Sequence, residues 1–221
     1  EYDNVMNTQR EVIYAQRKKV LDGEDLRENI LSMLRAFVDS TVAEVLSESG
    51  GVVTEGALPA LASRFEGIYF AKGTLMGRRE QLRGMKAQEL GDTVYEIALR
   101  TYEAKEVHYG ANIMRELERV VMLRVVDEYW MDNIDAMDDL KQGIGLRAYG
   151  QHDPVIAYKE EGYEMFQAMI TAIREETIRR MFLVQLRTNQ ELKREKVAKE
   201  TGTSAPDKTV KAQPVRNKDK K

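Results

Sequence analysis

Residues that could carry chemistry are few in this chain and poorly grouped. The two histidines, His108 and His152, lie far apart in the sequence, and cysteine is absent. Paired imidazoles and thiolate metal sites are therefore not expected. Asp135, Asp138 and Asp139 lie within one expected helix, where clustered carboxylates can hold a divalent ion but are more often solvated. We predict no metal site.

Motifs for nucleotide and acyl chemistry are also missing from the sequence. It contains no Gly-x-x-x-x-Gly-Lys-Ser/Thr phosphate loop and no Gly-x-Ser-x-Gly nucleophile motif. We therefore expect no catalytic residue and no cofactor in this chain, and we predict that on its own it is not an enzyme.

Two long helices dominate the pattern of the second half. Apolar residues recur every three or four positions, which is typical of amphipathic helices. The first stripe contains Ile113, Leu117, Val120, Leu123, Val126, Trp130, Ile134, Met137 and Leu140, and the second contains Tyr158, Phe166, Met169, Ile173, Ile178 and Phe182. The glycine-bearing stretch 143–154 ends in Pro154, which suits the start of a helix. These features predict an antiparallel hairpin.

The facing stripes also predict which side chains meet inside the hairpin. Trp130, Ile134 and Met137 are expected to pack against Tyr163, Phe166 and Ile170 or Ile173. Trp130 and Phe166 are therefore candidate structural residues. Tyr149 is different, because it lies in the polar connection with no helical partner to bury it. Its ring either contacts a passing chain or folds back on the hairpin.

The first half predicts shorter helices and an all-α fold class. We expect helices over residues 1–22, 24–48 with Leu26, Ile30, Leu34, Phe37, Thr41 and Val45 on one face, 58–65, and 85–108. The apolar run 68–70 fits a strand or a buried helix turn equally well. Gly110 is expected to bend the chain, because glycine costs about 1 kcal/mol relative to alanine inside a helix.

Charge is spread unevenly along the 221 residues. The net charge is −3, but residues 193–221 hold ten Lys or Arg against four Asp or Glu, which leaves a body of −9. We predict that this tail is disordered. It is either a solvated linker or a segment drawn to anionic lipid. The acidic body disfavours nucleic-acid binding, and no apolar run reaches the roughly 20 residues that a membrane span needs.

Three stretches resemble the SecA family of preprotein translocase ATPases. They are residues 1–14, 158–169 and 121–154, the last containing Gln-Gly-Ile-Gly-Leu-Arg-Ala-Tyr-Gly-Gln-His-Asp-Pro. The resemblance is strong over 1–22 and 113–187. Asn133 stands where the family usually has a histidine, and Ala148 where a glycine is common. The family's cysteine-rich zinc module has no counterpart here.

The resemblance implies an elongated helical scaffold with a small inserted wing and a two-helix finger. Residues 1–23 would be the end of the scaffold helix, 24–108 the helical wing, 109–190 the scaffold with its finger, and 191–221 a disordered basic tail. Because the chain opens inside a helical period, we expect a fragment of a longer protein. The alternative is a free-standing helical adaptor or coiled-coil interaction protein.

The resemblance also implies partners and site residues. Tyr149, Arg147 and Gly150 would contact unfolded preproteins and a SecY-type channel, and Gln9 and Arg10 would contact the protein's own motor domains. ATP and Mg would act in those motor domains. The expected location is the cytoplasm, peripherally at the cytoplasmic face of the bacterial cell membrane.

Overall fold

Helices make up the fold in the computed structural model, which describes residues 2–23, 26–147 and 153–186. They are α1 (Tyr2–Asp22), α2 (Leu26–Leu46), η1 (Ser47–Ser49), α3 (Ala57–Phe65), η2 (Met76–Arg78), α4 (Arg79–Leu82), α5 (Ala87–Tyr109), α6 (Ala111–Arg147) and α7 (Pro154–Leu183). Over the described ranges no strand forms, only isolated bridges at Val52–Lys86 and Glu66–Phe70. The predicted all-α class is confirmed. Residues 1–184 form one unit and residues 185–221 another.

Local sequence signals explain where the main helices begin and end. Gly23 and Gly110 adopt φ values of 76° and 88°, which other residues rarely reach. They follow α1 and α5 directly. The carboxylate of Asp153 accepts a hydrogen bond of 2.9 Å from the Val155 amide, and Pro154 occupies the first turn of α7.

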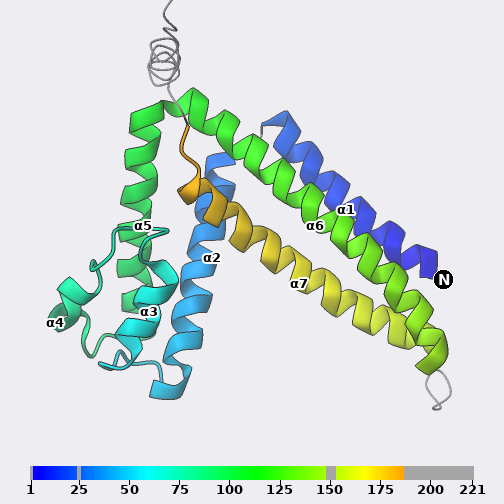
Figure 1. Ribbon diagram of the computed structural model, residues 1–221, viewed down its shortest axis with the longest axis horizontal. Helices are drawn as coiled ribbons and strands as arrows, with labels where there is room; N and C mark the ends of the chain where they lie inside the picture. The colour runs from blue at the N-terminus through cyan, green and yellow to red at the C-terminus, as the bar shows by residue number, and fades with distance from the viewer. Residues whose placement is uncertain (1, 24–25, 148–152, 187–221) are drawn as a thin grey trace, which may run out of the picture. The chain divides into compact units, whose positions relative to one another are not determined.

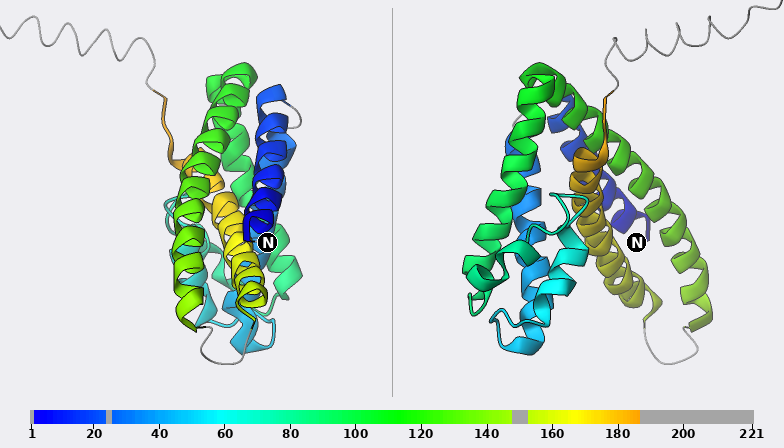
Figure 2. Two further views of the ribbon diagram at one scale, coloured as in Figure 1. Left: turned by 90° about the vertical axis from the view of Figure 1, so that its right-hand side faces the viewer. Right: turned by 60° about the vertical axis from the view of Figure 1, so that its left-hand side comes forward.

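Helices α6 and α7 pack along each other in opposite directions, as the predicted hairpin requires (Figure 1). Helix α1 lies along the same pair and contacts both of its members (Figure 2). Near the far end of the hairpin, Met137, Ile144 and Tyr158 form a small core, and Tyr2, Val5 and Met6 of α1 pack against it. The hairpin is therefore one part of a three-helix bundle.

The buried stripe of α6 differs from the predicted one. Ile113 and Val120 are 51% exposed, so placing them in the interface was wrong. The buried apolar residues of α6 are Met114, Leu117, Val121, Met122, Val125, Trp130, Met137 and Ile144. Because the run 120–123 is apolar throughout, either of two adjacent helix faces could be buried. Packing against α1, α2, α5 and α7 decides between them.

Tyr163 also contradicts its expected place in the hairpin interface, since it is 63% exposed. Its neighbour Gly162 faces α6 instead. A Cβ added to Gly162 would lie 2.7 Å from Met137 Cε and 3.8 Å from Val5 Cγ1. The absence of a side chain there lets Met137 fill the space between the helices, and the next residue along α7 points outward.

A second core fills the segment 24–108, which we call the wing segment. Its buried residues come from α2, α3, α5 and the loops between them, and include Leu34, Val38, Leu61, Phe65, Tyr69, Phe70, Leu90 and Val94. The run 68–70 forms neither a strand nor a helix turn. It is a non-helical turn in which the Tyr69 and Phe70 rings are buried. Ile178 of α7 belongs to this core, and the Phe182 ring lies 5.1 Å from that of Tyr69.

Replacing Trp130 with alanine should destabilise the bundle strongly. The side chain is 5% exposed, and removing a buried tryptophan typically costs about 3–5 kcal/mol. Met131 is next to it and 59% exposed, so Met131→Ala should cost under about 0.5 kcal/mol. Urea unfolding of both variants measures the difference, and equal small losses would show that Trp130 is not packed.

Candidate functional site

The connection between α6 and α7 carries the residues expected to touch a translocating chain. Helix α6 ends at Arg147, whose side chain is outside the described set, and Tyr149 and Gly150 lie outside the described residues. The structure therefore fixes the two helix ends that hold this connection, and the roles of these three residues stay predictions.

A buried amide contact joins the three helices of the bundle. Gln9 of α1 is 6% exposed, and Asn133 of α6 is 5% exposed. Gln9 Nε2 donates to the carbonyl oxygen of Gly162 on α7 at 3.0 Å, and Asn133 Nδ2 donates to Gln9 Oε1 at 3.1 Å. Both amides thereby find partners in the interior, where an unpaired polar group would be costly. We call these three residues the amide junction.

The amide junction shows how one predicted site residue is placed within this chain. Gln9 was expected to contact a motor domain, but its side chain is buried and its amide is used within this chain. The sequence shows it only as a polar interruption of the α1 stripe, which is equally typical of a solvent-facing edge. Arg10 is exposed and donates to Asn7 Oδ1 at 3.3 Å.

Aromatic and charged contacts hold the start of α1 to the far part of the hairpin. The rings of Tyr2 and Tyr158 meet edge to face, with centroids 4.7 Å apart. Lys141 Nζ lies 3.3 Å from Asp3 Oδ1. Burial raises the pKa of Tyr158, which keeps this ring neutral. The hairpin is thus supported close to the connection that carries Tyr149.

Trp130 lies where α6 meets α1. It lines a groove of about 630 Å³ with Tyr14, Arg17, Lys18, Leu21, Asp127, Met131 and Ile134. An ion pair between Arg17 and Asp127 joins the two helices beside it. Phe166 on α7 is 8% exposed. Both rings are therefore placed as packing residues of the bundle.

A partly buried polar cluster spans the corner where α5 turns into α6 at Gly110. The Tyr102 hydroxyl donates to Glu118 Oε1, and one guanidinium nitrogen of Arg115 lies 2.8 Å from that oxygen and 2.6 Å from Glu106 Oε1. Arg27 Nε of α2 donates to Glu106 Oε2 at 3.4 Å. We call these five residues the corner cluster.

Glu118 is the most deeply buried charge of the corner cluster, with 0% exposure. Burial raises the pKa of its carboxyl, and the Tyr102 hydrogen bond and the Arg115 charge act in the opposite direction. Burial together with the bond to Glu118 also raises the pKa of the Tyr102 phenol. The sequence gives no sign of this cluster, because its members are separated by up to 91 positions, from Arg27 to Glu118.

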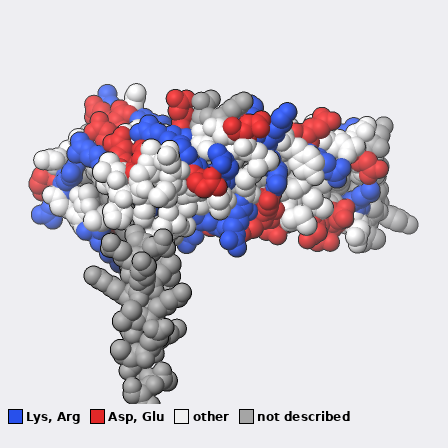
Figure 3. Space-filling model, turned by 90° about the horizontal axis from the view of Figure 1, so that it is seen from above, with Lys and Arg blue, Asp and Glu red and all other residues white. Residues whose placement is uncertain are grey.

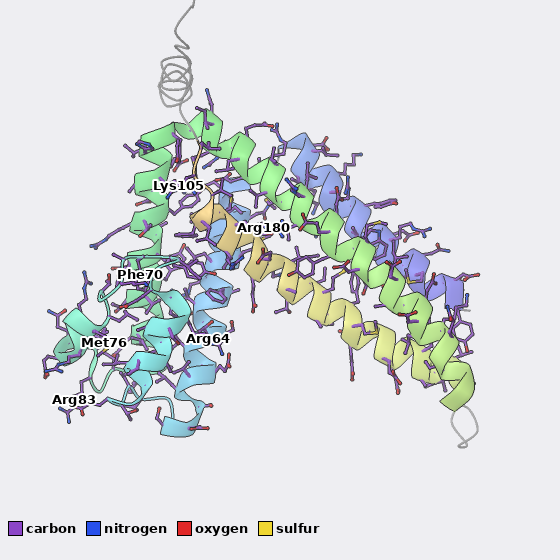
Figure 4. The ribbon with its side chains drawn as sticks, in the orientation of Figure 1. Arg64, Phe70, Met76, Arg83, Lys105 and Arg180 are labelled. Atoms are coloured by element: carbon purple, nitrogen blue, oxygen red, sulfur yellow. The ribbon has the colours of Figure 1, made fainter. Side chains whose placement is uncertain are left out.

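Lys105 caps the carboxyl end of α7 by hydrogen bonding. Its ammonium group donates to the carbonyl oxygens of Met181 and Val184 (Figure 4). A cation at this position interacts favourably with the helix dipole, although burial lowers the pKa of Lys105. Arg180 links the same end of α7 to α6 through a 2.6 Å contact with Glu128 Oε2.

Both acidic and basic side chains lie on the surface of the described residues. Asp135, Asp138 and Asp139 are exposed, and within residues 2–23, 26–147 and 153–186 no three acidic, histidine or cysteine residues are placed to hold a metal ion. Acidic and basic side chains are interspersed over the face in Figure 3. None of the helices in the described part is long and apolar enough to cross a membrane.

Comparisons with known proteins agree with this architecture. A family model described as the SecA wing and scaffold domain matches residues 1–185. The protein translocase subunit SecA 1 of Alkaliphilus metalliredigens is 44% identical over 215 residues, which cover 97% of this chain and 24% of the relative. SecA of Pelotomaculum thermopropionicum is 48% identical over 185 residues (83% and 20%), and that of Clostridium acetobutylicum is 43% identical over 224 residues (100% and 26%). The chain thus spans about a quarter of the length of these relatives.

The amide junction should behave as one energetic unit. Gln9→Leu or Asn133→Leu alone leaves a buried amide unpaired, which costs about 1–3 kcal/mol. The double variant should cost less than the sum of the two single variants, by about 0.5–3 kcal/mol. Urea unfolding of the four proteins gives the coupling, with Arg10→Ala and Asn133→Leu as an uncoupled control pair. Additive losses for Gln9 and Asn133 would contradict the contact.

Glu118 should make stability depend on pH in a defined direction. The unfolded carboxyl ionises near its ordinary pKa of 4.5, whereas the folded one ionises at higher pH. Stability relative to Glu118→Gln should therefore fall as pH rises from 4.5 through the raised pKa, and stay constant above it. Urea unfolding of both proteins across this range measures the difference. A relative stability that rises with pH would show that the Arg115 ion pair outweighs burial.

Proposed function

This chain belongs to the SecA family, and we propose that it forms the scaffold, wing and two-helix finger of a protein-export motor. In this proposal the finger couples the movements of ATP-driven motor domains to the passage of preproteins through a SecY-type channel. ATP and Mg would act in the motor domains, outside this chain. The protein would work in the cytoplasm and at the cytoplasmic face of the bacterial membrane.

The amide junction is the observation that supports this mechanical role most directly. The α6/α7 hairpin can transmit force only if it cannot slide along α1. Two hydrogen bonds oppose sliding, one from Asn133 to Gln9 and one from Gln9 to the Gly162 carbonyl, because any shift in register would leave these polar groups unpaired. Displacing α1 would therefore displace the hairpin with it.

Different parts of this chain are assigned different partners. We assign the α6/α7 connection, with Arg147, Tyr149 and Gly150, to contact with the preprotein and the channel. A tyrosine ring offers apolar area without demanding a particular sequence, which suits a site that many preproteins pass. The exposed Arg10 on α1 is assigned to a motor-domain contact. The basic segment 193–221 is assigned to anionic lipid.

Replacing Tyr149 with alanine should impair transport without unfolding the bundle. The ring is assigned to the moving chain, so its loss should slow preprotein translocation by the complete subunit, and Tyr149→Phe should restore it. Stability should change by under about 0.5 kcal/mol, as for most surface loop residues. Normal translocation by the alanine variant would remove the contact role, and a large loss of stability would show that the ring is packed.

A further inference from the structure

The chain changes direction between α5 and α6 at a single residue, Gly110, which has free space around it. Helix α5 ends at Tyr109 and α6 begins at Ala111. Gly110 between them has φ 88° and ψ 148°, and a Cβ added there would meet no atom within 4 Å. The packing around Gly110 itself therefore does not fix the angle between the two helices, so other contacts must hold it.

Polar contacts on one turn of α5 provide those restraints. Tyr102 and Glu106 face the first turns of α6, where the Arg115 guanidinium lies 3.0 Å from the Tyr102 hydroxyl and 2.6 Å from Glu106 Oε1. Glu118, one turn further along α6, accepts from Tyr102 and Arg115. These contacts cross the corner on the inside, where they oppose opening about Gly110.

The same turn of α5 is tied to two further helices. Arg27 of α2 contacts Glu103 and Glu106 at 3.3 and 3.4 Å. Lys105, between them in sequence, donates to the carbonyl oxygens at the end of α7. Residues 102–106 thus contact α2, α6 and α7 within about one helical turn, so the polar face of this turn determines how the wing segment meets the bundle.

The corner cluster is built for a defined geometry more than for stability. Glu118 Oε2 and Arg115 Nε are buried without a hydrogen-bond partner. A buried charge such as Glu118, with an unpartnered atom, is often no more stabilising than an apolar residue of the same volume. Its charged groups nevertheless accept few alternative arrangements, because each displaced group would lose its partner inside the protein.

We propose that Tyr102 and Glu118 are positioning residues that, with Arg115, Glu106 and Arg27, lock the angle between α5 and α6 about Gly110. Together with the packing of α7 on the wing core, the lock sets where the wing segment stands relative to the hairpin. Breaking its contacts would loosen the angle between α5 and α6, and the packing of α2 and the end of α7 would be left to hold the wing segment. This conformational role goes beyond the proposed transport function and can be measured on this chain alone.

Distance measurement between two spin labels tests the lock. The chain has no cysteine, so Glu48→Cys beyond α2 and Asp139→Cys on α6, both exposed positions, accept labels in an otherwise unchanged protein. The distance distribution is recorded for the parent chain, Tyr102→Phe and Glu118→Gln. Glu116→Gln is the matched control, because this exposed carboxylate on the same helix pairs with Arg119, outside the cluster. Circular dichroism reports the helix content of each protein.

The lock predicts a narrow distribution in the parent and in Glu116→Gln, and a broader or shifted one in Tyr102→Phe and Glu118→Gln with helix content unchanged. Combining the two cluster substitutions should broaden it no further than the larger single effect. If Glu118→Gln loses its helix content, Tyr102→Phe decides, since it removes only a hydroxyl group. Unchanged distributions in the cluster variants, or equal broadening in the control, would overturn the proposal.

Discussion

The buried amide junction is the interaction on which the remaining arrangement depends. Gln9 and Asn133 are long-range partners, and together with the Gly162 carbonyl they bring α1, α6 and α7 to one point. Apolar stripes alone would permit neighbouring registers, because dispersion and hydrophobic contacts are not directional. The polar contacts select one register. The close approach of Met137 to Gly162 at the same level of the bundle has the same effect.

Much of the fold could be predicted from the sequence because its signals are local. The glycines after α1 and α5, the Asp153–Pro154 start of α7 and the apolar periodicity of α2, α5 and α7 each act within a few residues. Other features depend on partners far away in the sequence. The local sequence around Gln9 fits a solvent-facing position, and only its contacts with α6 and α7 show that it is buried. Whether Val120 or Val121 is buried depends on packing against four neighbouring helices. No local sequence signal indicates the corner cluster.

The wing segment is completed by the end of α7. Ile178 is part of its core, and Phe182 packs against Tyr69 there. The chain therefore leaves the wing segment through α5, passes along the hairpin and returns to the wing core. There Lys105 donates a hydrogen bond to a carbonyl oxygen in the last turn of α7. This return connects hairpin and wing through packing as well as through the Gly110 corner. A displacement of α7 would therefore disturb the packing of both the hairpin and the wing segment.

Site-specific crosslinking from position 149 tests the proposed role of the hairpin most directly. The complete subunit would carry Tyr149→Cys, or Glu164→Cys at an exposed position of α7, with a photoreactive group on the cysteine, and would be stalled with a preprotein in the channel. The account predicts crosslinks to the preprotein from position 149 and few from position 164. Equal yields from both positions, or none from position 149, would contradict it.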